Sequence, residues 1–302
     1  ICLTNLNYAA EVTELLNSFV RVMSAAIDAR SPYNANHTRN MARYAEKFVD
    51  WLNGEGEAAF DDERRRQLLM SVWLHDIGKL VVPLEVMDKE SRLGPRTKDV
   101  MNRFQTFALQ NEIECLSLSI DGSERARRAG ELEAARELVE KSNRAGFLSD
   151  ETLAALRELG GKTGPDGTPF LMDEELACLL VRRGTLTDEE RRVMESHVLM
   201  TRRMLSEMNF PGHYKSVPGW ASSHHEYLNG KGYPDNLSGE AIPVEVRILT
   251  VLDVYDALTA QDRPYKPATP TEKAFAILKD MAANGQLDPG IVERFIRSEA
   301  WK

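Results

Sequence analysis

The stretch that decides the fold class is DDERRRQLLMSVWLHDIGK, at residues 61–79. It opens with two acidic residues, which favour the start of a helix, and its apolar residues then recur at helical spacing. Those on the apolar face are Leu68, Leu69, Val72 and Trp73. The pattern predicts a helix over residues 61–77 whose last turn carries His75 and Asp76.

The other strong patterns along the chain are also helical. Apolar residues recur every three or four positions over residues 4–29, 37–52, 187–208, 218–227, 244–258 and 271–283. Residues 229–243 contain several glycines and prolines, so we expect a structured loop there. The chain is therefore predicted to have an all-α fold.

Length and charge limit the class of protein. A chain of 302 residues can form one large domain or two average ones and can bury a sizeable core. Lys plus Arg number 38 and Asp plus Glu number 47, which gives a net charge of −9. This acidic balance argues against a general DNA-binding surface, whereas a small anionic substrate can still bind in a local positive pocket.

Cysteine content and the chain start bear on location. Cys2, Cys115 and Cys178 are too few and too far apart for a disulfide framework or a cysteine-rich metal site, and they suit a reducing cytosol. No stretch approaches the ~18 consecutive apolar residues of a membrane span. Because the chain begins at Ile1 rather than Met, we expect it to be the cytoplasmic part of a longer protein with sensor or membrane regions upstream.

Imidazole and carboxylate groups fall on helix faces that are otherwise apolar. The members of this set are His37, His75-Asp76, His197, His224-His225-Glu226 and Asp253. Burying an unpaired carboxylate costs several kcal/mol, whereas a metal ion turns both Asp and His into satisfied ligands. Metal coordination therefore accounts for the whole set. Each member alone has a structural alternative: a hydrogen-bonded core histidine, an Asp253–Arg247 ion pair, or surface residues at 224–225.

Taken together, the motifs resemble the HD phosphohydrolase superfamily and, within it, the HD-GYP family. The first motif is His75-Asp76-Ile77-Gly78-Lys79, with His37 and Asp253 as outlying partners. The second is HHEYLNGKGYP at residues 224–234, and the likeness continues through LSGEAIP at 237–243, LDVYDALT at 252–259 and DRPYK at 262–266. The resemblance covers roughly residues 20–90 and 184–285.

The resemblance implies an HD-domain helical bundle with a Gly-Tyr-Pro loop and a two-metal site. In bacterial signal transduction, such domains hydrolyse cyclic dinucleotides, above all cyclic di-GMP, to the linear dinucleotide, where the reaction either stops or continues to GMP. The family uses iron or manganese, and a metal-bridging hydroxide attacks the phosphodiester. By position, one ion would be held by His37, His75, Asp76 and Asp253, and the other by His197, His224 and His225, with Asp76 bridging. Some members bind a third ion through a Glu four residues before the first His; Tyr33 stands there, so we predict two.

Lys79 and four later residues are the expected substrate contacts. Lys79 follows Asp76 by three residues, so it projects from the same helical face toward the phosphate, or acts as a cation at the helix end. Gly232 allows a close approach of the backbone to the substrate, and Tyr233 contacts a base or phosphate or packs the loop. Arg263 and Lys266 resemble residues that grip the phosphates. The spacing between Thr259 and Arg263 is one residue longer than in the family pattern. The alternative role of Arg263 is an ion pair with Asp262 or Asp256.

The chain departs from the family pattern by a long insert. Residues 82–87 and 184–187 resemble neighbouring parts of the family pattern, yet about ninety residues separate them. A loop of that length would be exceptional, so we expect residues 89–183 to form a helical insert, with helices over 96–115, 123–144 and 150–159. It would be a lid, a dimerisation arm, a regulatory contact or a packing appendage. The remaining divisions are a connecting helix at 1–30 and a catalytic domain at 31–88 and 184–302.

Three functions fit these features. The leading one is a metal-dependent cyclic-dinucleotide phosphodiesterase. The others are a catalytically silent receptor of the same ligand, and a phosphohydrolase of another nucleotide. The 4–29 helix would serve a homodimer, or only cover the core.

Overall fold

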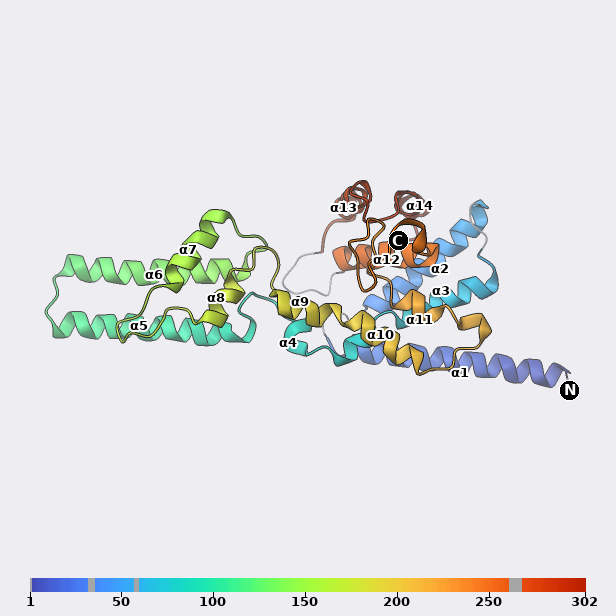
Figure 1. Ribbon diagram of the computed structural model, residues 1–302, viewed down its shortest axis with the longest axis horizontal. Helices are drawn as coiled ribbons and strands as arrows, with labels where there is room; N and C mark the ends of the chain where they lie inside the picture. Colours follow the sequence, from blue (N-terminus) through green and yellow to red (C-terminus); the bar gives the residue numbers. More distant parts are fainter. Residues whose placement is uncertain (1, 32–35, 57–59, 261–267) are drawn as a thin grey trace. The chain divides into compact units, whose positions relative to one another are not determined.

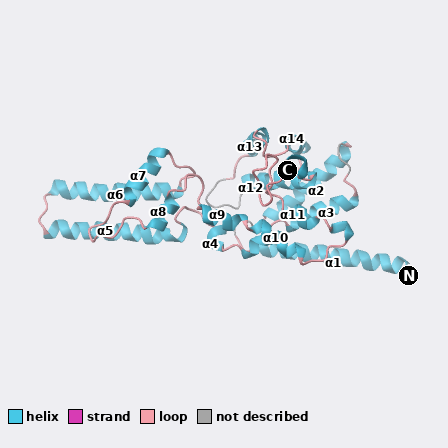
Figure 2. Ribbon diagram, viewed as in Figure 1, coloured by secondary structure: helices cyan, strands magenta, loops and turns pink. Residues whose placement is uncertain are grey.

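The computed structural model describes residues 2–31, 36–56, 60–260 and 268–302 (Figure 1). Helices joined by loops make up these segments (Figure 2). Their β pairing is confined to the isolated bridges Phe147–Arg183, Thr163–Pro169 and Asn229–Ser238. The predicted all-α class is confirmed. No helix within the described segments is both long enough and apolar enough to cross a bilayer.

The chain divides into two compact units. One consists of residues 1–82 together with 193–302, and the other of residues 83–192. The first unit thus joins two segments that are distant in the sequence. The predicted limits of the insert, residues 89 and 183, stay a prediction.

The first unit packs its helices around one main core. They are α1 (Cys2–Asp28), α2 (His37–Glu55), α3 (Asp62–Leu74), η1 (Ile77–Val81), α10 (His197–Ser206), η3 (Gly212–Tyr214), α11 (Val217–Ala221), η4 (Gly239–Ala241), α12 (Val244–Thr259), α13 (Thr271–Ala283) and α14 (Pro289–Ser298). Phe48 of α2, Leu252 of α12 and Phe295 of α14 are fully buried in this core. A second cluster buries Val20 and Ile27, so the C-terminal half of α1 covers the core.

The second unit contains a long helical hairpin with shorter helices packed on it. Its elements are α4 (Leu84–Met87), η2 (Gly94–Arg96), α5 (Thr97–Ser117), α6 (Gly122–Arg144), α7 (Asp150–Gly160) and α8 (Asp173–Leu179), and α9 (Asp188–Glu195) crosses its limit. Figure 1 shows α5 and α6 side by side. The fully buried Arg92 donates to the carbonyls of Ser142 and Val181, both at 2.7 Å, and so joins segments fifty and eighty-nine residues away.

Three predicted helices end earlier or break, and each break lies at a candidate metal ligand. The helix predicted over 61–77 stops at Leu74, before His75. The helix predicted over 187–208 is interrupted at Ser196, so that α10 starts at His197. The helix predicted over 218–227 ends at Ala221, before His224. α8 and α14 were not predicted.

The cause of these breaks is local hydrogen bonding by the histidines themselves. In each case the ring Nδ1 lies 2.7 Å from the carbonyl oxygen three residues earlier: Val72 for His75, Met194 for His197 and Ala221 for His224. Side chains that bond to nearby backbone carbonyls compete with the helical hydrogen bonds. Apolar periodicity does not carry this information.

Candidate metal centre

The histidines that end these helices all present the same ring nitrogen to one another. A carbonyl oxygen only accepts hydrogen bonds, so the Nδ1 atoms of His75, His197 and His224 carry the hydrogen. In the neutral imidazole, Nε2 then has a free lone pair. His37 reaches the same state because its Nδ1 donates to Asp256 Oδ2 at 2.7 Å.

These Nε2 atoms converge in two groups. His37 Nε2 lies 3.1 Å from His75 Nε2, and His197 Nε2 lies 3.4 Å from His224 Nε2. His225 completes the second group, with its ring centroid 4.1 Å from that of His224. In the first group, Asp253 Oδ1 lies 3.4 Å from His37 Nε2.

Asp76 stands between the two groups. Its Oδ2 lies 3.3 Å from His75 Nε2 and 3.6 Å from His37 Nε2. Its Oδ1 faces the other way, 3.4 Å from His197 Nε2 and 3.8 Å from His224 Nε2. One carboxylate oxygen therefore addresses each group, as a bridging ligand would.

The centre fits cations better than it fits hydrogen bonding. Asp76 Oδ1 is buried and has no hydrogen-bond donor among the described residues, although two histidines face it. Lone pairs of oxygen and nitrogen that meet without hydrogens between them repel one another, and a metal ion satisfies all of them. The donor atoms of His37, His75 and Asp253, and those of His197, His224 and His225, each lie within 4.8 Å of one another.

Electrostatics keeps the ligands ready to bind. Burial holds the pKa of His225 at about 4 and that of His224 well below its usual value, so both rings are neutral at pH 7. Burial opposes ionisation of Asp76, yet the positive charge of Lys79 outweighs it and holds the pKa of Asp76 well below the usual range. Lys79 Nζ lies 2.6 Å from Asp76 Oδ2, and its side chain is largely buried.

Close packing of η1 on α10 sets the distance between the two groups. Gly78 lies so near α10 that a Cβ there would be 1.9 Å from the carbonyl oxygen of His197. Thr201 Oγ1 accepts from the Gly78 N–H at 3.0 Å and donates to the carbonyl of His75 at 3.0 Å. Thr201 therefore joins the two helix ends that carry the ligands.

The C-terminal half of α1 and the turn that follows it also hold the elements that carry the site. Arg30 donates to the carbonyl of Lys79 at 2.5 Å, and Ser24 donates to the carbonyl of Trp73 at 2.5 Å. Asp28 accepts a hydrogen bond from Thr38, beside His37, at 3.0 Å. The end of α1 and the turn after it thus contact three positions at or near residues of the metal site.

The Gly-Tyr-Pro loop folds back over His225. The buried Glu226 carboxylate accepts from the backbone N–H groups of Asp235 at 2.6 Å and Leu237 at 2.8 Å. A Cβ on Gly232 would lie 2.3 Å from the backbone nitrogen of Tyr227, so packing within the loop requires glycine there. The Tyr233 ring centroid lies 4.8 Å from that of His225, which places this tyrosine beside the centre.

The structure brings most of the predicted site residues together. Those assembled in the first unit are His37, His75, Asp76, Lys79, His197, His224, His225, Gly232, Tyr233 and Asp253. Tyr33, Arg263 and Lys266 lie outside the described residues. Thr201 and Arg30 went unnoticed in the sequence because neither is unusual at its position, Thr201 on a helix and Arg30 in the turn after one. Asp256 stood out only as an alternative partner of Arg263.

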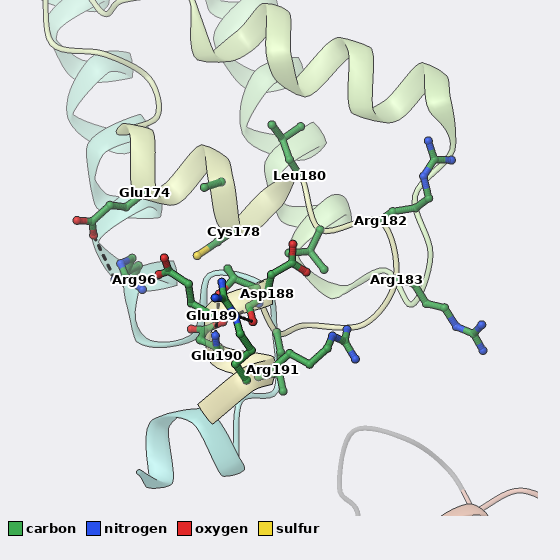
Figure 3. A pocket seen from close by; sticks show the side chains of 15 residues that line it. Arg96, Glu174, Cys178, Leu180, Arg182, Arg183, Asp188, Glu189, Glu190 and Arg191 are labelled. Atoms are coloured by element: carbon green, nitrogen blue, oxygen red, sulfur yellow. Dashed lines mark hydrogen bonds and ion pairs between the residues drawn. The ribbon is translucent and has the colours of Figure 1, made fainter. Parts of the chain in front are cut away.

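A hollow of about 980 Å³ in the second unit is the other site to consider (Figure 3). Its walls carry arginines and acidic residues in similar numbers, and Arg96 pairs with Glu174 at 3.3 Å. At its edge the buried Lys89 ammonium is neutralised by Glu190 at 2.7 Å. None of the described residues that line this hollow is a histidine, and its charges largely balance, so they provide neither a metal-ligand set nor a strong positive charge.

Comparison with known proteins adds independent evidence. Residues 171–291 match the family model described as the HD domain. That segment contains His197, His224, His225 and Asp253 but not the ligands that precede the second unit. The match therefore covers one part of the centre only. The proximity of His37, His75 and Asp76 to that part comes from the structure.

Curated relatives share parts of the chain. A cyclic di-GMP phosphodiesterase of Vibrio cholerae serotype O1 is 39% identical over 128 residues, which are 40% of this chain and 25% of that protein. The cyclic di-GMP phosphodiesterase response regulator RpfG of Xanthomonas campestris pv. campestris is 38% identical over 152 residues, 50% of this chain and 36% of that protein. A 3'3'-cGAMP-specific phosphodiesterase 3 of Vibrio cholerae serotype O1 is 36% identical over 103 residues, 34% of this chain and 22% of that protein. The matches thus span between a fifth and about a third of these relatives' length.

Proposed function

Because this chain contains an HD domain of the HD-GYP family, we propose that it is a metal-dependent phosphodiesterase that hydrolyses a cyclic dinucleotide, with cyclic di-GMP as the first candidate. The observation that carries the proposal is the position of Asp76, which turns one oxygen to each of two histidine groups. Relatives named for cyclic di-GMP and for 3'3'-cGAMP support the substrate class.

The proposed cofactors are two divalent ions, iron or manganese. His37, His75 and Asp253 would hold one, His197, His224 and His225 the other, and Asp76 would bind both. When bound, such a pair supplies hydroxide from a shared water at neutral pH and neutralises the charge of a phosphodiester. Imidazole and carboxylate donors suit both metals.

Lys79 and Tyr233 are proposed to orient the phosphodiester. The Lys79 ammonium is held by Asp76 Oδ2 at 2.6 Å, so a fixed positive charge stands at the edge of the centre. Burial raises the pKa of Tyr233, which keeps its hydroxyl protonated and able to donate a hydrogen bond to a phosphate oxygen. Its ring, beside His225, also offers a stacking surface for a base.

The proposed reaction consumes one water and opens the ring. The phosphorus–oxygen bond to one ribose breaks, hydroxide adds to the phosphorus, and the leaving ribose oxygen takes up a proton, which yields the linear dinucleotide. A second hydrolysis would yield GMP.

We further propose a cytoplasmic setting, an upstream sensor region, a homodimer and no DNA partner. Residues 89–183 would act as an insert into the catalytic domain at 31–88 and 184–302, with 1–30 as a connecting helix.

Turnover of metal-replete protein tests the proposal. Cyclic di-GMP, 3'3'-cGAMP and linear pGpG would be incubated with Mn²⁺- or Fe²⁺-loaded protein and the products separated by chromatography. Cleavage of a cyclic dinucleotide is the expected result. Binding without cleavage of any of them would indicate a receptor rather than an enzyme. Cleavage of another nucleotide alone would contradict the proposed substrate class.

Asp76→Ala is the matching site variant, and Asp50→Ala is its control. Asp50 is an exposed aspartate of the same unit that pairs with Arg65. We expect Asp76→Ala to lose both ions and all turnover, because it removes the shared ligand, and Asp50→Ala to retain both. Two ions in Asp76→Ala would contradict the ligand assignment, and a third ion in the unmodified protein would contradict the count based on Tyr33.

A further inference from the structure

His37 differs from the other histidines of the centre in what holds its Nδ1 atom. His75, His197 and His224 each donate to a backbone carbonyl three residues earlier in the chain. His37 donates instead to a carboxylate, Asp256 Oδ2, at 2.7 Å. A carbonyl is a neutral dipole, whereas a carboxylate brings a full negative charge to the ring.

Asp256 has little else to bind. Its side chain is 1% exposed, and Oδ1 is buried without a hydrogen-bond partner among the described residues. Such a carboxylate is unfavourable unless positive charge lies nearby. The hydrogen bond to His37 places it one imidazole ring away from the expected cation.

α12 therefore presents a carboxylate to each side of the His37 ring. Asp253 and Asp256 are three residues apart and project from the same face of this helix. Asp253 Oδ1 lies 3.4 Å from Nε2, and Asp256 Oδ2 lies 2.7 Å from Nδ1. Rotation of the ring or a change of tautomer would lose the hydrogen bond to Asp256.

We infer that Asp256 is a positioning residue of the metal centre, which makes the His37–His75–Asp253 position the tighter of the two. It fixes the His37 tautomer with Nε2 free, and its charge makes that nitrogen a stronger donor to a cation. In the position built from His197, His224 and His225, the first two rings donate to backbone carbonyls, and Asp253 Oδ2 lies 3.8 Å from His225 Nδ1, too far for a hydrogen bond. Among the described contacts, no carboxylate accepts a hydrogen bond from these three rings as Asp256 does from His37. The inference rests on the proposed metal-dependent function and assigns a loading order to it.

The test is a Mn²⁺ titration of the full chain, without substrate, in competition with a chromophoric chelator. We expect the unmodified protein to bind two ions with distinct affinities. Asp256→Ala should weaken the tighter step by about 10- to 100-fold and leave the other step unchanged. Asp256→Asn should weaken it less, because an amide oxygen still accepts the Nδ1 hydrogen while the charge is lost.

Tyr255→Phe is the matched control. It alters the neighbouring position of α12, whose ring packs on Tyr44 and Phe295 in the core, and should leave both steps unchanged. Thermal melting followed by circular dichroism shows whether each variant is folded. If Asp256→Ala does not fold, the titration of Asp256→Asn still decides the test. Side-chain ¹⁵N spectra of the metal-free histidines should show the His37 Nδ1–H tautomer lost in Asp256→Ala.

The inference would be overturned if folded Asp256→Asn and Asp256→Ala bound Mn²⁺ in both steps as tightly as the unmodified protein. Equal weakening of the two steps would overturn it as well. Failure of the proposed function is distinguishable from this. A protein that cleaves no cyclic dinucleotide but loses Mn²⁺ affinity on substitution of Asp256 would keep the positioning role and lose the phosphodiesterase assignment.

Discussion

Gly78→Ala is expected to separate the two halves of the metal centre while adding only one methyl group. The new Cβ would lie 1.9 Å from the carbonyl oxygen of His197 and 2.6 Å from the backbone nitrogen of Thr201. Both are backbone atoms of α10, so no side-chain rotation relieves the contact. The gap must widen by more than about 1 Å before it reaches an ordinary van der Waals distance.

Such a shift acts on stability and on the site together. Overpacking of this kind costs about 1–3 kcal/mol of the free energy of unfolding. In the unmodified protein, His197 Nε2 lies 3.4 Å from Asp76 Oδ1, and the shift moves these two atoms apart. It also strains the hydrogen bond from the Gly78 N–H to Thr201 Oγ1. A displacement of about 1 Å at a reacting centre can lower turnover about 10²-fold.

Urea unfolding, metal analysis and turnover would be measured on the same preparation. Gly54→Ala is the control, because Gly54 lies in α2 of the same unit with open space where the Cβ would go. It should be neutral or stabilise by up to about 1 kcal/mol. The steric reasoning is refuted if Gly78→Ala unfolds at the unmodified urea midpoint, retains both ions and turns over normally.

Three further perturbations follow from the same contacts. Removal of divalent ions with a chelator should abolish turnover and lower the free energy of unfolding by about 2.7 kcal/mol for each site that was held at free metal 100 times its Kd; an unchanged melting temperature would argue against a folded-state metal site. Lys79→Met should lower turnover at least about 10²-fold with both ions retained, since Lys79 supplies charge rather than a ligand atom, and turnover within twofold of normal would exclude that role. Glu175 in the second unit is bound by Arg103 at 2.6 and 2.9 Å, which outweighs burial and lowers its pKa from the usual 4.5. This pair therefore stabilises above pH 4.5 and loses its effect as the pH falls below it, so Glu175→Ala should cost about 3 kcal/mol at pH 7 and much less at pH 3; an equal cost at both would contradict the assignment.

Helix positions could be predicted from the sequence where apolar periodicity was long and uninterrupted. α13 begins and ends where predicted, and α12 is within one residue. α14 escaped prediction although its buried residues, Ile291, Val292 and Phe295, lie at helical spacing. α8 is only seven residues long, too short for a clear period.

Ligand chemistry was also accessible from the sequence. Histidines and carboxylates on apolar faces are costly unless they are paired, and this local conflict identified His37, His75, Asp76, His197, His224, His225 and Asp253 as one set. The argument needs residue types and faces only. It says nothing about which ring nitrogen is free or which oxygen faces which histidine.

What only the tertiary structure decided is the pairing between elements. Asp256 and His37 are 219 residues apart, and Thr201 joins Gly78 and His75 across more than 120. Periodicity shows which face of a helix is buried but not the register in which two helices meet. The sequence by itself determined an all-α protein with a metal-type ligand set. The fold decided the bridging position of Asp76, the requirement for glycine at 78 and the carboxylate behind His37, because each depends on distances between segments that are remote along the chain.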